Sequence, residues 1–302
     1  MNMKMLALVL PFAMSTVALA EGSSSFGTTS QYMHQTDAGV FEVTPAFGMD
    51  WTTWKFKSPA SGGTAAKDAK DSKNVLSVMG EYGITEMLSV GAKFAYENDN
   101  MTQDPNLTSR KGMTDHHIFL NGRTGEGPGQ FRFGGDLSFA TGKGNVDANG
   151  NGNLQSGGMA LTPYVAYEMM LGNGLAGIRV AYDIVKTERT YNKDVKLTDG
   201  NSGKYALFYE MNMMPVVWGF DLALNTYAAS KAKITGQSTV GQNNAYSDFE
   251  VATYAAWEFS PGMTLLPKIG YGSSVAGPRY VEAANTKSTT GFGASVGLRI
   301  AL

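Results

Sequence analysis

One position in this sequence has an aspartate next to two histidines, which are residue types used in acid–base catalysis. His116 and His117 directly follow Asp115, and the remaining histidine of the chain is His34. Neighbouring side chains of a β-strand point to opposite faces, so the two adjacent imidazoles would not bind one metal ion. A general acid–base site also needs a second positioned group, and we identify no carboxylate pair at a matching height. We therefore expect no catalytic residue here and no enzyme.

Asp147, Asn149 and Asn151 repeat the first half of a calcium-binding loop, in which every second residue supplies an oxygen ligand. The bidentate glutamate that should complete the loop is replaced by Gly158. A flexible Asn/Gly-rich loop explains the segment better, although calcium binding stays open. Glycine-rich pieces such as 125–127 lie in turns and open no helix, so they are not phosphate loops. We expect no metal and no cofactor.

Along stretches of alternating polarity, the charged residues fall on the same face as glycine, serine and threonine. An arginine or lysine facing lipid at the membrane midplane would cost about 2–4 kcal/mol, so this phase predicts a wet or ion-paired interior. The predicted lumen-lining residues are Glu42, Asp50, Glu81, Lys93, Arg132, Asp136, Glu168, Arg179, Asp183, Asp221, Glu250, Lys268 and Arg299. Further inward charges on the same faces are Glu97, Arg123, Glu210, Asp248 and Glu258. Acidic residues outnumber basic ones in this set, which favours cations.

These side chains need elements that alternate between two faces, and the sequence supplies them as about twelve strands of period two. Phe220 and Leu222 share one face of such a stretch, and Asp221 and Ala223 share the other. The apolar faces reach about 10 residues, the length that a tilted strand needs to cross a bilayer. The predicted strands are 39–57, 74–83, 88–98, 115–124, 130–142, 158–170, 175–190, 203–213, 216–234, 247–259, 263–277 and 288–302.

The connections between these strands alternate strictly between short and long. Glycine and proline mark the short ones, as tight hairpins require, whereas Lys, Asp, Asn, Gly and Ser fill the long ones, 58–73, 99–114, 143–157, 191–202, 235–246 and 278–287. Short periplasmic turns and longer external loops are typical of a membrane barrel, here with both termini at one end. A propeller with a similar repeat would have no reason to alternate its loop lengths.

Aromatic residues gather where the predicted strands meet the connections, as two interfacial girdles require. The expected periplasmic ring is Phe41, Tyr82, Phe131, Tyr167, Trp218, Trp257 and Phe259, and the expected outer ring is Trp51, Tyr96, Phe139, Tyr182 and Tyr227.

Residues 1–20 have the layout of a secretory signal peptide, with Lys4, a short apolar run and a small-residue end at 18–20. The polar residues 21–38 are expected to form either a loose periplasmic tail or a plug inside the barrel, which occupies 39–302. The chain has no cysteine, so an exported protein of this size must be stabilised by a large hydrogen-bonded sheet. Lysine and arginine are scattered, and the net charge is −2, which argues against nucleic acid as a partner.

Two segments resemble known families. Residues 291–302 end in an alternating apolar strand that resembles the C-terminal assembly signal of bacterial outer-membrane proteins, which implies recognition by the barrel assembly machinery; that family usually ends in Phe or Trp, and this chain ends in Leu302. Residues 82–91, YGITEMLSVG, resemble the "YGITD-x-LSVG" hairpin of outer-membrane transporters, including those found with aromatic-compound degradation operons. This resemblance implies a tight periplasmic turn and hints at apolar substrates.

The sequence therefore predicts an all-β transmembrane antiparallel up-and-down barrel in the outer membrane, surrounded by lipid. We expect a narrow passive pore for small solutes with a weak cation preference, carried above all by Glu42, Asp136, Asp183, Asp221 and Glu250. One alternative is a carrier for small hydrophobic or aromatic compounds, which would use the inward aromatics Phe119, Tyr164, Phe208 and Tyr254. Another is a closed structural or adhesive barrel that acts through its external loops.

Overall fold

A computed structural model describes residues 31–56, 68–103, 106–125, 129–141, 145–146, 152–155, 158–185, 189–192, 195–198, 201–234, 240–243, 245–276 and 286–302. The predicted signal peptide and the Asp147–Asn151 loop lie outside these residues. No helix within the described ranges is long and apolar enough to cross a membrane.

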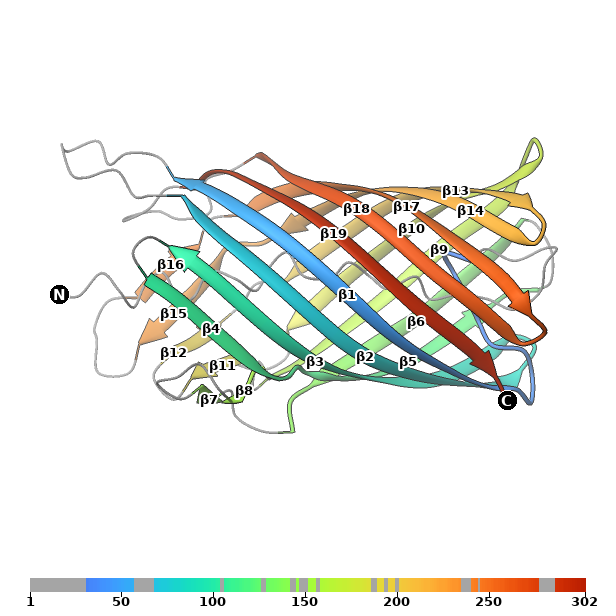
Figure 1. The fold of residues 1–302 in the computed structure, drawn as a ribbon, viewed down its shortest axis with the longest axis horizontal. Helices are drawn as coiled ribbons and strands as arrows, with labels where there is room; N and C mark the ends of the chain where they lie inside the picture. The colour runs from blue at the N-terminus through green and yellow to red at the C-terminus, as the bar shows by residue number, and fades with distance from the viewer. Residues whose placement is uncertain are drawn as a thin grey trace.

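Antiparallel strands close into a twelve-stranded barrel, as the alternation predicts (Figure 1). β4 and β5 occupy one position in the wall, because both pair with β3 on either side of a break at residues 114–115. The barrel strands are β1 (Phe41–Phe56), β2 (Ala69–Thr85), β3 (Leu88–Gln103), β4 (Asn106–Met113), β5 (His116–Arg123), β6 (Gln130–Phe139), β9 (Met159–Leu171), β10 (Gly174–Val185), β13 (Ser202–Met213), β14 (Val216–Tyr227), β17 (Tyr246–Ser260), β18 (Met263–Ala276) and β19 (Thr286–Ala301).

The wall closes where β1 pairs with β19, with Phe47 opposite Val296. The amide of Leu302 donates to the carbonyl of Phe41 at 2.8 Å, so the C-terminus lies at the end where β1 begins. The tight turns 171–174, 213–216 and 260–263 belong to this end, called the short-turn end below; the opposite end is the long-loop end. Gly172 and Gly262 adopt positive φ angles of 63° and 72°, which glycine reaches without strain.

Several predicted strand boundaries are wrong at the long-loop end. Residues 216–234 were expected to form one strand, but β14 ends at Tyr227 and β15 (Ser230–Ile234) pairs in a separate sheet with β12 (Val195–Thr198). The other strands there are β7 (Asn145–Val146), β8 (Gly152–Asn153), β11 (Arg189–Asn192) and β16 (Val240–Asn243). β2 also begins five residues earlier than expected, because residues 69–73 are paired although they show no apolar face.

The outer surface of the barrel is apolar, as the alternation predicts. Along β14 the side chains of Trp218, Phe220 and Leu222 are exposed, whereas those of Asp221 and Ala223 are almost fully buried. Such a continuous apolar belt would be unfavourable in water and matches lipid. Of the predicted girdle residues, the exposed ones are Phe41, Trp51, Tyr82, Tyr96, Phe131, Tyr182, Trp218, Trp257 and Phe259.

Candidate functional site

Four inward aromatic rings line the lumen, each over a glycine of the preceding wall strand. Each ring lies directly opposite its glycine in the strand register, and a Cβ atom on any of these glycines would collide with the ring. Glycine therefore provides the space in which the ring lies flat against the wall. The couples are Phe119 with Gly91, Tyr164 with Gly134, Phe208 with Gly177, and Tyr254 with Gly219.

Residues 31–38, called the N-terminal segment below, pack against these rings. Tyr32 stacks on Phe208 with ring centroids 4.8 Å apart and lies 6.0 Å from the ring of Tyr254. Tyr32 and Met33 join Phe208, Tyr254 and the small wall residues Ala166, Ala206 and Ala223 in one buried apolar cluster. Burial raises the pKa of the Tyr32 phenol to about 12, so the ring is neutral in this cluster.

Glu210 of β13 fixes the start of the N-terminal segment. Its Oε2 accepts the backbone amide of Gln31 at 2.8 Å, and its Oε1 accepts the backbone amide of Tyr32 at 2.6 Å. The hydroxyl of Tyr254 donates to the same Oε1 at 2.8 Å. The carboxylate is buried, and a buried carboxylate is tolerated when such donors replace water.

The next residues of the segment are held by β1 and β19. The imidazole Nε2 of His34 hydrogen-bonds Glu42, whose Oε2 also accepts the hydroxyl of Thr36 at 3.0 Å. Arg299 donates to the side-chain oxygen of Gln31 at 3.1 Å. Burial, together with the nearby charges of Arg299 and Arg132, lowers the pKa of His34 well below its ordinary value of 6.5.

The segment leaves the lumen at the short-turn end. Gly39 and Val40 exchange backbone hydrogen bonds of 2.8 and 3.0 Å with Gly83, at the end of β2. A Cβ atom at Gly83 would collide with the backbone of Asp37, so glycine permits this close approach. The chain thus turns at the rim, with residues 31–36 on its lumen side and β1 in the wall.

Two pairs of predicted lumen residues form buried ion pairs. Arg132 donates to Glu168 Oε1 from Nε at 3.0 Å and from Nη2 at 2.9 Å, close to the short-turn end. Lys268 donates to Asp221 Oδ2 at 3.1 Å, nearer the middle of the barrel. Opposite charges at these distances offset much of each other's field.

Other predicted lumen residues bind partners that the sequence did not identify. Lys204 donates to Glu250 Oε2 at 3.3 Å. Asp136 Oδ1 lies 2.8 Å from the Nδ1 of His117. His117 faces the lumen side, whereas His116 faces the other way, between Phe94 and Phe139, as expected for neighbours in a strand.

The remaining predicted residues lie at different heights in the barrel. Glu81 accepts the side-chain amide of Asn121 at 3.2 Å, and Asp183 accepts the hydroxyl of Thr162 at 3.2 Å. The guanidinium of Arg179 lies over the ring of Tyr164, 4.5 Å from its centroid. Lys93 lies opposite His117 in the register of β3 and β5. These residues therefore do not form one charged ring.

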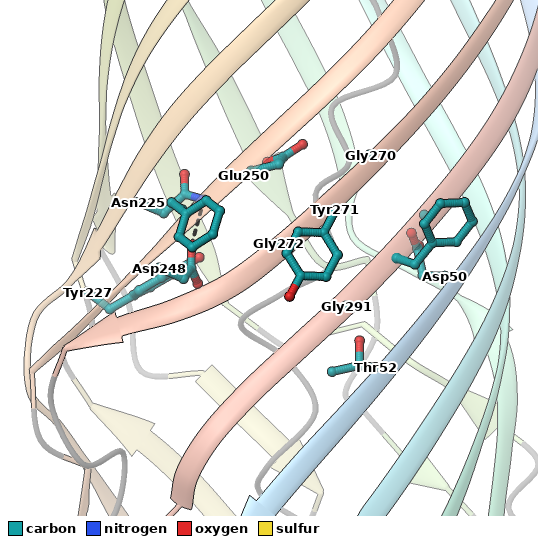
Figure 2. Close-up of a pocket in the computed structure, with 13 residues that line it drawn as sticks. Asp50, Thr52, Asn225, Tyr227, Asp248, Glu250, Gly270, Tyr271, Gly272 and Gly291 are labelled. Carbon is teal, nitrogen blue, oxygen red and sulfur yellow. Dashed lines mark hydrogen bonds between the residues drawn. The ribbon is translucent and has the colours of Figure 1, made fainter.

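A cavity lies in the lumen wall toward the long-loop end, between β14, β17, β18, β19 and β1 (Figure 2). Asp50, Asp248 and Glu250 line it, and the amide of Asn225 donates to Asp248 at 2.8 Å. Glycines without side chains form much of its remaining lining: Gly270, Gly272, Gly291 and Gly293. Among the described residues, no group of three or more His, Asp or Glu has the arrangement of a metal site.

Sequence reasoning missed the docking residues Gln31, Tyr32 and His34 and the cation Lys204. The inward phase of Glu42 and Glu210 was the available signal that hydrogen-bond donors must approach these two carboxylates. The chain order gave no indication of the partner, because Gln31 and Glu210 are 179 residues apart.

The fold is known from other proteins, although no family model and no curated protein matches the sequence. An outer-membrane channel from Pseudomonas putida F1 aligns with a TM-score of 0.61 at 13% identity, over 91% of this chain and 100% of that chain. The TodX monoaromatic hydrocarbon channel aligns with a TM-score of 0.47 at 9% identity (89% and 92%), and the NanC porin with 0.41 at 13% (82% and 98%). The Pseudomonas alignment shows a shared barrel fold. With its lipid-facing belt, the closed barrel belongs in the outer membrane, as predicted from the sequence.

Proposed function

We propose that the protein is a passive outer-membrane channel for small solutes, and that its N-terminal segment acts as a plug. The observation that carries this proposal is the docking of residues 31–36 across the short-turn end of the lumen, on Glu210, Glu42 and Arg299. Residues 31–36 are all buried. Polar contacts to buried carboxylates hold the two ends of this stretch, so undocking requires water or other donors to replace them.

Planar-bilayer conductance tests the plug. A variant with glycine at Tyr32, His34 and Thr36 loses the side-chain contacts of the segment while the barrel wall keeps every residue. We expect its time-averaged conductance per barrel to exceed that of the unaltered protein by about tenfold, because the docked population falls. Glycine at the exposed turn residue Met214 is the matched control and should leave conductance unchanged. Equal conductance in all three proteins would reject the plug.

A weak cation preference belongs to the same proposal. Asp50, Asp248 and Glu250 line the cavity toward the long-loop end, and a lumen lined by one sign of charge concentrates ions of the other sign. The pairs Arg132–Glu168, Lys268–Asp221 and Lys204–Glu250 reduce this field, so the preference is expected to be small.

A second candidate function is passage of small aromatic compounds, favoured by one specific observation. Phe208, Tyr254 and Tyr164 form an aromatic surface inside the lumen. When the segment undocks, this surface faces the solute pathway, where an aromatic solute can stack on it. The test uses liposomes that contain the variant with glycine at positions 32, 34 and 36, called the plug-free variant. Faster uptake of an aromatic solute than of an aliphatic solute of the same size would support this function. Equal permeability to the two solutes would reject it.

A further inference from the structure

Tyr32 occupies a site whose chemistry can be described from the contacts of its own atoms. Its ring stacks on Phe208 at 4.8 Å with the ring planes inclined by 24°, and Tyr254 flanks it at 6.0 Å. At the same time its backbone nitrogen donates to Glu210 at 2.6 Å. Only the Cβ and Cα atoms separate that ring from that nitrogen. The part of Tyr32 that the barrel recognises is therefore an aromatic ring joined through a two-carbon link to an N–H donor.

Glu210 loses hydrogen-bond donors when the segment leaves. In the docked state its carboxylate accepts N–H donors from Gln31 and Tyr32 as well as the hydroxyl of Tyr254. Undocking removes both N–H donors from this carboxylate, which is buried in the docked state. A buried carboxylate that loses its donors is costly unless a cation or new donors replace them.

Charged groups of both signs lie around the ring of Tyr32. The positive charges of Arg179 and Lys268 act on the Tyr32 phenol. The negative charges of Asp221 and Glu250 act on it in the opposite sense. Arg179 is also stacked on Tyr164, and Lys268 is bound to Asp221. The carboxylate of Glu210, which accepts a hydrogen bond from the backbone nitrogen of Tyr32, favours a positively charged group at the position of that nitrogen.

We infer that Phe208, Tyr254 and Glu210 form a binding site for arylethylamines, in which the aromatic ring of the ligand lies on Phe208 and its ammonium binds Glu210. Tyr32 is the internal occupant of this site, and the ligand displaces it. This inference deepens the proposed function and rests on it, since the site opens when the plug undocks. An ammonium group offers up to three N–H donors in place of the two backbone amides that undocking removes. Its positive charge is also opposite to that of the Glu210 carboxylate.

The approach from the long-loop end suits the same ligand class. The cavity with Asp50, Asp248 and Glu250 lies in the wall on that side, and its field attracts an organic cation before the ligand reaches the ring site. Neutral aromatic compounds would gain only the stacking, and small inorganic cations only the charge.

Isothermal titration calorimetry on the folded barrel in detergent tests the site with four probes. Phenethylamine carries both features, 2-phenylethanol lacks the charge, ethylbenzene lacks any donor, and ethylamine lacks the ring. We expect phenethylamine to bind the unaltered protein, and Tyr32→Ala to tighten that binding by about tenfold because the internal competitor is gone. Glu210→Gln in the Tyr32→Ala background should weaken it by about tenfold or more, because a charge-assisted contact is lost.

Matched controls separate this site from general effects on the lumen. Glu258→Gln removes an inward carboxylate that binds the amide of Gly262 instead, and Phe119→Leu removes an inward ring outside the apolar cluster. Both should leave the affinity for phenethylamine unchanged. Heat-modifiable mobility on gels verifies that each variant is folded.

Other outcomes overturn the inference. Equal affinity for phenethylamine and 2-phenylethanol, or affinity that survives Glu210→Gln, would exclude Glu210 as the ammonium partner. If Tyr32→Ala raises conductance yet no variant binds phenethylamine, the plug stands and the arylethylamine site is rejected. If phenethylamine binds but Tyr32→Ala changes neither affinity nor conductance, the displacement of Tyr32 and the plug are both rejected.

Discussion

The His34 imidazole and the Glu42 carboxylate pair inside the lumen, eight residues apart in sequence, and both side chains are almost completely buried. Thr36 donates to the same carboxylate, and Arg299 and Arg132 add positive charge nearby. Burial is the main cause that lowers the pKa of His34, and the two arginines lower it further. The docked segment therefore holds His34 in its neutral form.

Acidification should undock the segment. Because the pKa of docked His34 lies below its ordinary 6.5, the undocked segment binds a proton more readily as the pH falls through that value. Docking is thus fully stable above about pH 6.5 and weakens below it. We expect conductance in planar bilayers to rise between pH 7 and pH 5. His34→Gln should abolish the rise, whereas His117→Gln, which alters a pair with Asp136 outside the segment, should preserve it. A rise that persists in His34→Gln would assign the effect to another group.

Cysteine labelling can follow the segment directly, because the chain contains no cysteine of its own. Met33 is buried in the apolar cluster, so Met33→Cys should react slowly with a thiol reagent while the exposed control Met214→Cys reacts fast. Adding Glu210→Ala should accelerate labelling at position 33 by about tenfold or more, since it removes the acceptor for two backbone amides. Fast labelling of Met33→Cys in the otherwise unaltered protein would contradict the docked segment.

The glycine–aromatic couples predict which glycines tolerate a methyl group. Gly219→Ala places its Cβ against the ring of Tyr254, and overpacking of this kind costs about 1–3 kcal/mol. Gly135 is the matched control, because the nearest atom to its added Cβ lies 3.8 Å away, an ordinary contact. Urea denaturation should show Gly219→Ala less stable and Gly135→Ala unchanged. The double change Gly219→Ala with Tyr254→Ala should relieve the collision, so additive losses would argue against it.

The barrel wall was predictable because each spanning strand has one apolar and one polar face. Apolar and polar residues alternate along β14, with Phe220 and Leu222 exposed and Asp221 buried. This alternation can be recognised in one strand without knowing which strands pair with it. The extension of β2 over residues 69–73 was missed because a strand outside the membrane is polar on both faces and has no such period.

The site was less predictable than the wall. The inward phase of Glu42 and Glu210 followed from alternation, but their partners His34, Gln31 and Tyr32 belong to a short polar segment without periodicity. Docking depends on where the closed wall brings these carboxylates, so the sequence alone favoured a loose tail for residues 21–38 and left the plug as the alternative.

The inside–outside phase of β14 is tested by a charge on its outer face. Leu222 is about half exposed toward lipid, and an arginine there should cost about 2–4 kcal/mol near the midplane and impair assembly. Asp221 is buried against Lys268, so removing one partner alone would leave an uncompensated charge. The paired change Asp221→Asn with Lys268→Met should therefore leave the barrel folded, as judged by heat-modifiable gel mobility. Normal assembly of Leu222→Arg would reverse the assigned phase.

Charge selectivity should depend on the acidic cavity rather than on the paired residues deeper in the lumen. Asp50 lines that cavity with Asp248 and Glu250, so Asp50→Lys changes the local charge by two units where solutes pass. In the plug-free variant with glycine at 32, 34 and 36, we expect a reversal potential in a salt gradient that indicates weak cation preference. Asp50→Lys should move it toward anions, because the field in a low-dielectric tube follows its nearest charges. The control is the double change Arg132→Gln with Glu168→Gln, which removes a buried pair and no net charge and should leave the potential unchanged. Anion preference in the plug-free parent would reject the cation-selective pore.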